Sequence, residues 1–112
     1  MAIHHASSGE VIDIGPLGDR IVNSPTMTLV KTDQLEIIRL MLPAGKEIAD
    51  HKVAGPVTVQ CLEGQIEFHM QHKSLSLERG QLIYLEGNQV HSLKGVQDAS
   101  VLVTIQLLPR GD

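Results

Sequence analysis

Alternation of side chains in two segments limits the fold of this chain more than any other feature. In residues 65–71 and 100–108, every second side chain is apolar: Ile66, Phe68 and Met70, and Val101, Val103, Ile105 and Leu107. Successive side chains of a β-strand point to opposite faces, so each segment reads as a strand with one buried face. We therefore predict buried side chains at Ile66, Phe68, Met70, Val101, Val103 and Ile105, and exposed side chains at Glu67 and His69.

Turn residues divide the rest of the chain into further short β-rich segments. We expect strands in residues 26–32, 35–42, 57–62, 74–78, 81–85 and 91–93, and turns at residues 33–34, 43–45, 63–64, 79–80, 87–89 and 95–98. Residues 11–14 are a further short strand or an extended arm, and residues 16–22 have room for one helical turn. About nine short strands without a long helix are typical of a β-sandwich or barrel.

Composition and charge exclude several classes of protein. The net charge is −4, the basic residues form no cluster, and the aromatic residues are Phe68 and Tyr84, so we expect no nucleic-acid partner. No stretch reaches the roughly 18 apolar residues of a membrane span, and residues 1–10 do not resemble a secretory signal. We therefore expect a cytoplasmic protein without a membrane partner. The single cysteine, Cys61, excludes an intramolecular disulfide and is expected to be a buried, unreactive thiol.

Glycine and proline residues interrupt the first part of the chain, which sets it apart from the rest. We predict an N-terminal arm in residues 1–25 and a single barrel domain in residues 26–112. The arm and apolar side chains that the alternation places outward, such as Leu40 and Leu62, favour a homodimer, because single domains with uncovered apolar strand surface tend to pair.

A glycine-bounded segment of residues 45–64 carries the first histidine of interest. Gly45 is followed after five residues by His51, and Gly64 closes the segment. Between them, Gly55 and Pro56 form a rigid turn that ends before the next strand.

A second glycine-led segment carries the other histidine. Gly80 is followed after five residues by Glu86, then by Asn88, and His91 comes three residues after Asn88. Together, the two segments resemble the paired motifs of the cupin superfamily, the small barrels of the germin-like and RmlC-like type. The resemblance implies an all-β fold, an antiparallel double-stranded β-helix or jelly-roll barrel, with His51 and His91 in one pocket.

The resemblance also implies a metal site, which this chain matches only in part. Many cupins hold a divalent ion with three histidines and one glutamate, and only His51 and His91 match those positions. Val53 and Val57 stand at the other two positions and offer no lone pair. Any Fe, Mn, Ni or Zn is therefore expected to be absent, or weakly held and completed by Glu86, by another nearby carboxylate, by water or by the ligand.

Two functions follow from these residues and the resemblance. The first is a binding module whose pocket, formed by His51, His91, Val53, Val57 and Glu86, holds a small organic molecule. The alternative is a metal-dependent cupin enzyme of the dioxygenase, isomerase or decarboxylase type with a reduced ligand set. The fold does not choose between them, and the identity of the ligand does not follow from the sequence.

Overall fold

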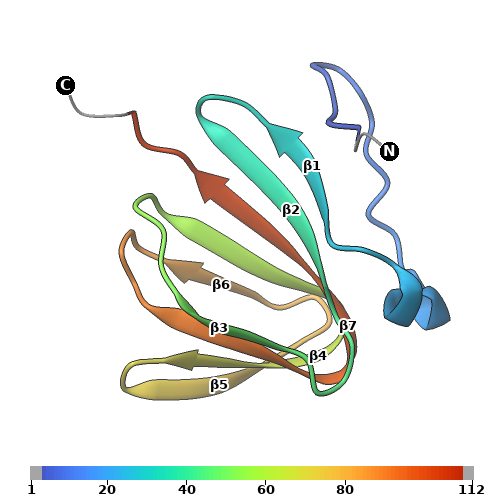
Figure 1. Cartoon of the computed structure of the whole chain (residues 1–112), viewed down its shortest axis with the longest axis vertical. Coiled ribbons are helices and arrows are strands. Elements are labelled where there is room, and N and C mark those ends of the chain that lie inside the picture. Colours follow the sequence, from blue (N-terminus) through green and yellow to red (C-terminus); the bar gives the residue numbers. More distant parts are fainter. Residues whose placement is uncertain (1–3, 110–112) are drawn as a thin grey trace.

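The computed structural model describes residues 4–109, and within this range the chain forms seven strands and one short 3-10 helix (Figure 1). The strands are β1 (Met27–Lys31), β2 (Leu35–Leu42), β3 (Glu47–His51), β4 (Val57–Met70), β5 (Lys73–Glu78), β6 (Leu82–Leu85) and β7 (His91–Gln106), and the helix is η1 (Gly18–Asn23). The ends of the two predicted ranges, residues 1–3 and 110–112, lie outside the described residues. No helix in residues 4–109 has the length and apolar character that crossing a membrane requires.

Two long strands, β4 and β7, pair with each other along most of their lengths and run through both layers of the fold (Figure 1). In the first layer the strand order is β1-β2-β7-β4-β6, and in the second it is β3-β7-β4-β5. All these pairs are antiparallel. The all-β jelly-roll prediction is confirmed.

The predicted turns at residues 63–64 and 95–98 are wrong, because both segments are bends inside the long strands. The β4–β7 ladder shifts register around Glu63 and Gln65, as strands do at β-bulges. Gly64 has a φ of 78°, and a Cβ there would collide with the backbone of Asp98. A Cβ on Gly95 would meet the carbonyl oxygen of Pro43 at 2.6 Å. These glycines let the strands bend without ending, so the chain has fewer and longer strands than expected.

The core lies between the two layers, on the side chains that the alternation predicted. Ile66, Phe68, Val101, Val103 and Ile105 are buried, and Cys61 is buried beside them. Glu67 is exposed, as predicted. Two positions differ: Met70 is only half-buried at the end of β4, and His69 is only half-exposed.

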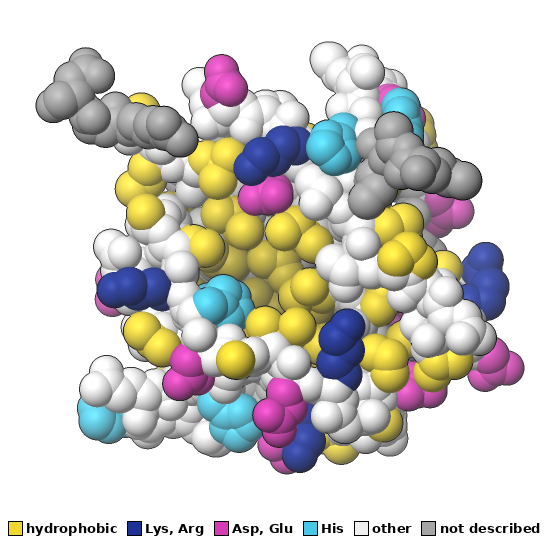
Figure 2. Space-filling view, in the orientation of Figure 1, with side chains coloured by type: hydrophobic (Ala, Val, Ile, Leu, Met, Phe, Trp, Pro, Cys, Tyr) yellow, Lys and Arg dark blue, Asp and Glu magenta, His cyan; other side chains and the backbone are white. Residues whose placement is uncertain are grey.

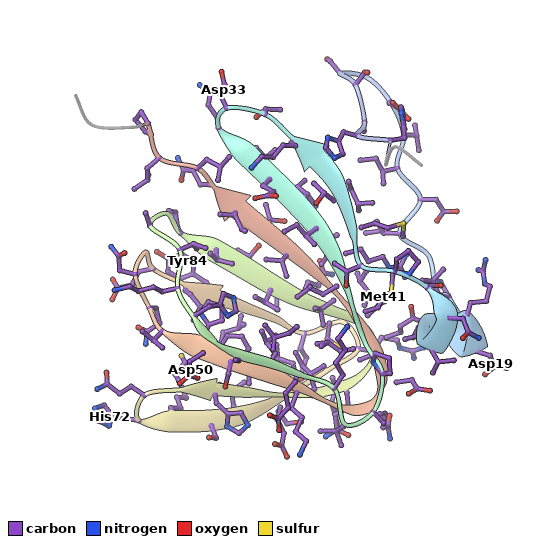
Figure 3. All side chains as sticks on the ribbon, viewed as in Figure 1. Asp19, Asp33, Met41, Asp50, His72 and Tyr84 are labelled. Carbon is purple, nitrogen blue, oxygen red and sulfur yellow. The ribbon has the colours of Figure 1, made fainter. Side chains whose placement is uncertain are left out.

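The N-terminal arm covers the outer face of β2, and this overturns one prediction made from the alternation. Leu40 packs against the core instead of pointing outward. The opposite face of β2 places Arg39 and Met41 outward, and both are buried nonetheless. Met41 lies beside η1, whose Ile21 is also buried (Figure 3). Because the arm covers the outer face of β2 around Arg39 and Met41, the apolar pattern of this part does not show which face belongs to the core.

A buried ion pair lies where β4 bends. Arg39 Nη2 donates to Glu63 Oε2 at 2.9 Å and to the Gly15 carbonyl at 2.7 Å. The Ser100 hydroxyl donates to the same carboxylate oxygen at 2.7 Å and accepts from Arg39 Nη2 at 3.1 Å. Arg39 is 3% exposed and Ser100 is fully buried.

Backbone groups of the arm complete this network. The amide groups of Leu17 and Gly18 donate to the Glu63 carboxylate at 3.0 Å. Burial opposes ionisation of Glu63, but the hydrogen bonds from Ser100, Gly18 and Leu17 and the charge of Arg39 outweigh it, so the pKa of Glu63 is lowered. We call Arg39, Glu63 and Ser100 the polar node. It fastens the arm to the barrel.

Candidate functional site

His51 and His91 meet at the junction of β3 and β7. His51 is the last residue of β3, His91 is the first residue of β7, and the two are register partners in the ladder. Their ring centroids lie 4.2 Å apart, with the planes tilted by 56°. We call this arrangement the histidine pair. It brings together two residues that are 40 positions apart in the sequence.

Each imidazole is held by a backbone carbonyl two residues earlier. His51 Nδ1 lies 3.0 Å from the Ala49 oxygen, and His91 Nδ1 lies 2.9 Å from the Gln89 oxygen. A carbonyl oxygen only accepts, so Nδ1 carries the hydrogen in both rings. In the neutral state each Nε2 is therefore left with a free lone pair.

The two rings differ in their surroundings. His91 is 4% exposed and stacks on Phe68, with the ring centroids 5.4 Å apart and the planes within 9° of parallel. His51 is exposed. Burial lowers the pKa of His91, and the neighbouring His51 lowers it further, while the hydrogen bond to Gln89 and the charge of Asp50 act in the opposite direction. The lowered pKa favours the neutral form of the buried His91 ring.

The interior next to the pair is apolar and partly open. Figure 2 shows a hollow in the middle of the molecule with a hydrophobic floor and a histidine side chain at its edge. Several half-buried side chains pack against the core and supply apolar surface: Ile38, Leu40, Ile48, Val53, Met70, Leu75, Ile83 and Leu107. An apolar wall with a few polar groups is the usual makeup of a small-molecule site.

The other predicted site residues lie on neighbouring segments. Val57 is buried in the core, and Val53 is half-buried against it. Glu86 is exposed, in the turn before β7. This turn packs closely on residues 52–55: the Asn88 amide donates to the Val53 carbonyl at 2.7 Å, and a Cβ on Gly87 would collide with the backbone of residue 54. The turn thus holds the backbone of Glu86 close to the segment that follows His51, while the Glu86 side chain is exposed to solvent.

The donor set does not fit a divalent metal ion. Within residues 4–109, no three or more His, Cys, Asp or Glu side chains gather in a way that could hold an ion. Structural and catalytic metal sites usually take three or four protein ligands, and here two imidazoles face valines at the remaining positions. The weakly held metal stays a prediction.

Other histidines and the cysteine lie elsewhere. His72 is at the tip of the β4–β5 hairpin (Figure 3). His69 faces outward, with Nδ1 2.8 Å from the Ser74 hydroxyl oxygen. Cys61 is buried, as predicted, and burial raises the pKa of its thiol, which makes the thiolate scarce.

Two grooves on the outside of the second layer do not include the histidine pair. The first groove, of about 280 Å³, is lined by residues of β3, β4 and β7, including Glu47 and Lys94. The second, of about 600 Å³, is lined by residues that include Met70 and Ser74. Asp50 and His69 line both grooves. Their linings are rich in charged and polar groups and open to solvent. They are poorer candidates than the barrel interior, which combines apolar walls with two fixed acceptors.

Sequence reasoning missed two features of the site. The stacking of Phe68 under His91 was not expected, although both residues had been placed correctly on their strands. The carbonyl groups of Ala49 and Gln89 were also missed, because backbone acceptors leave no mark in the side-chain pattern. No sequence signal could have suggested them, since every residue has a carbonyl two positions before it.

Comparison with known proteins extends the geometric picture. No family model and no curated protein sequence matches the chain. Among solved structures, a conserved protein of unknown function from Streptococcus pyogenes superposes with a TM-score of 0.74 at 22% identity, covering 98% of both chains. A cupin superfamily protein from Desulfitobacterium hafniense has a TM-score of 0.72 at 14% identity, covering 74% of this chain and 76% of its own.

A third similar structure is an RmlC-like cupin protein from Desulfovibrio desulfuricans, with a TM-score of 0.68 at 22% identity, covering 91% of this chain and 97% of its own. At these identities the likeness concerns the fold. The strand order, the two bent central strands and the superpositions agree, and the chain has the RmlC-like fold of the cupin superfamily.

Proposed function

We propose that the barrel binds a small, largely apolar organic molecule next to the histidine pair. One observation carries the proposal: two imidazoles with free Nε2 atoms stand at the edge of an interior that is otherwise apolar. The Glu63 carboxylate of the polar node already accepts from Arg39, Ser100 and two backbone amides, whereas the histidine pair keeps unused acceptors.

Ligand binding can be tested by screening small apolar molecules against the protein labelled with ¹³C at its methyl groups. Binding should shift the methyl resonances of inward side chains such as Ile38, Leu40 and Val53. A double variant, His51→Phe and His91→Phe, should lose most of the response. The proposal would be contradicted if ligands shifted only the resonances of residues that line the outer grooves. It would also be contradicted if they bound the double variant as tightly as the native protein.

The alternative, a metal-dependent enzyme, has less support because the pair lacks further ligands. A similar structure from Thermotoga maritima is described as a predicted oxalate decarboxylase; it has a TM-score of 0.66 at 23% identity, covering 74% of this chain and 79% of its own. Elemental analysis of the purified protein separates the two functions. Stoichiometric Fe, Mn, Ni or Zn that is lost in His51→Phe would favour the enzyme, and metal-free protein that binds apolar ligands favours the binding module.

We further propose a homodimer, with a second copy on the outer face of the first layer. Eight outward positions of this face carry no charge: Leu35 and Ile37 on β2, Thr58 and Gln60 on β4, Leu82 and Tyr84 on β6, and Leu102 and Thr104 on β7. Leu82 and Tyr84 (Figure 3) are 58% and 65% exposed. Because each copy has a net charge of −4, a face without charges is where two copies approach with least repulsion.

Light scattering at micromolar concentration tests the dimer, with Tyr84→Glu as the variant that places like charges across the interface. A dimeric native protein and a monomeric variant are expected. A native monomer would contradict the proposal. The cytoplasmic location and the lack of a nucleic-acid partner stay predictions.

A further inference from the structure

We infer that the histidine pair selects ligands that present a hydroxyl group on an apolar body, that is, small alcohols or phenols, and rejects carboxylates of the same size. This inference rests on the proposed function and names the class of molecule that the pocket takes. Three observations carry it: the orientation of the two rings, the access to their free nitrogens, and the uncharged side chains of the core beside them.

The orientation of the rings makes both of them acceptors. The Ala49 and Gln89 carbonyls each take the Nδ1 hydrogen, at 3.0 Å and 2.9 Å. Rotating either ring to offer an N–H to a ligand would break that hydrogen bond and leave a carbonyl oxygen facing a lone pair. When both rings are neutral, the ligand therefore meets two acceptors and no donor from this pair.

The free nitrogen of the buried ring remains within reach of a ligand. Within residues 4–109, no buried side-chain nitrogen or oxygen lacks a hydrogen-bond partner. His91 Nε2 has no partner within the protein, so it must reach the accessible surface even though its residue is 4% exposed. Phe68 stacks on one face of the His91 ring and restricts its rotation.

The side chains that pack in the core beside the pair carry no charge: they are aliphatic, apart from Phe68 and Cys61. Lys31 on β1 is paired with the Glu36 carboxylate at 3.3 Å. Arg39, the buried cation, is committed to Glu63 in the polar node. A carboxylate placed at the pair would lose its hydration and face two lone pairs, a large cost, whereas a hydroxyl group donates to one of them. The negative charge of Asp50, which is felt at His91, adds to the repulsion of an anion.

Phenol, anisole and benzoate form a matched set of probes for this inference. They share one ring, but phenol donates a hydrogen bond, anisole has the donor replaced by a methyl ether, and benzoate is an anionic acceptor. Binding is followed at pH 8 by methyl shifts, and the imidazole ¹⁵N shifts report directly whether Nε2 accepts a hydrogen bond. We expect phenol to bind about tenfold more tightly than anisole, as one hydrogen bond allows, and benzoate to bind most weakly.

Variants separate the pair from the rest of the barrel. In the double variant with His51→Phe and His91→Phe, phenol and anisole should bind within about twofold of each other, since the acceptors that distinguish them are gone. His69→Phe removes a histidine from the outer face of β4 and should leave the tenfold preference unchanged.

The outcomes distinguish this inference from the function on which it rests. Equal binding of phenol and anisole inside the native barrel, or a preference for benzoate, would overturn the selection of hydroxyl groups while leaving a binding barrel intact. No binding of any probe in the interior would overturn both. A phenol preference that persists in the double variant would show that another group supplies the acceptor.

Discussion

The polar node and the histidine pair are two polar sites in one apolar barrel, and they differ in how completely their hydrogen bonds are used. Glu63 accepts from Arg39, Ser100 and two backbone amides, and Arg39 donates further to a carbonyl. The histidine pair uses one nitrogen of each ring and leaves the other free. Both sites join segments that are distant in the sequence.

This difference separates a structural role from a binding role. A buried polar group that has all its partners contributes to the native state and has nothing left for a ligand. A buried polar group with a spare acceptor at the surface is more costly to keep unless a ligand or water uses it. The use of their hydrogen bonds therefore gives the polar node a structural role and supports the proposed binding role of the histidine pair, although both look alike as isolated polar residues.

The largest expected effect is at the node. Glu63→Gln removes the charge that pairs with Arg39 and places an amide NH₂ among groups that all donate. Breaking a buried ion pair on one side costs about 3–5 kcal/mol, and we expect a loss in the free energy of unfolding in this range. Urea unfolding measures it. Glu67→Gln, on the exposed face of the same strand, is the control and should change stability by less than about 0.5 kcal/mol.

Protonation of Glu63 at acid pH should lower the free energy of unfolding by less than Glu63→Gln does, because the protonated carboxyl group keeps its shape. The pKa of Glu63 in the folded protein lies below its ordinary value of 4.5, so its contribution to stability is complete at neutral pH. It is lost as the pH falls below 4.5 and through the folded-state pKa. Unfolding measured from pH 7 to pH 3 should show this loss in the native protein and a shallower slope in Glu63→Gln. Equal slopes would show that other groups set the acid dependence.

The histidine pair should tolerate replacement better. His91→Phe keeps an aromatic ring stacked near Phe68 but removes the hydrogen bond to the Gln89 carbonyl, so we expect a cost of about 1–3 kcal/mol. The same variant should lose most of the binding of phenol. A loss of stability as large as that of Glu63→Gln would contradict the division between the two sites, and the thermal unfolding of both variants measured side by side decides it.

The smallest expected effect on stability is at His51. Its side chain is exposed and lies outside the core cluster, so His51→Ala should change the free energy of unfolding by no more than about 0.5 kcal/mol. Binding of phenol should nevertheless weaken, because one of two acceptors is gone. Titration of the variant beside the native protein separates these two quantities. Unchanged affinity would assign recognition to His91 alone.

Side-chain periodicity predicted the barrel because it reports burial on one face, and the covered faces at Ile66, Phe68, Val101 and Ile105 are those it indicated. It failed where two faces are covered, as at Leu40, since the arm on the far side of β2 does not appear in the local pattern. It also took Gly64 for a turn, because a bend within a strand and a turn between strands use the same residue.

For the site, motif spacing predicted which histidines to examine, because the distance from a glycine turn fixes where a strand begins or ends. It did not predict what they could do. The direction of each ring depends on the Ala49 and Gln89 carbonyls, and the absence of a third metal ligand depends on where the exposed Glu86 side chain points. Those facts belong to three-dimensional packing, which spacing along the chain does not encode.

The position of β7 in the chain has a consequence for how the protein is made. β7 pairs with β2, β3 and β4, and its last residue, Gln106, pairs with Leu35 at the start of β2. Until the ribosome has synthesised β7, these three strands lack a pairing partner and expose apolar surface. Native pairing of the central strands can be completed only after Gln106 has left the exit tunnel. Such distant pairings are typical of slow folding, and the nascent barrel is a natural client for chaperones that shield unpaired strands.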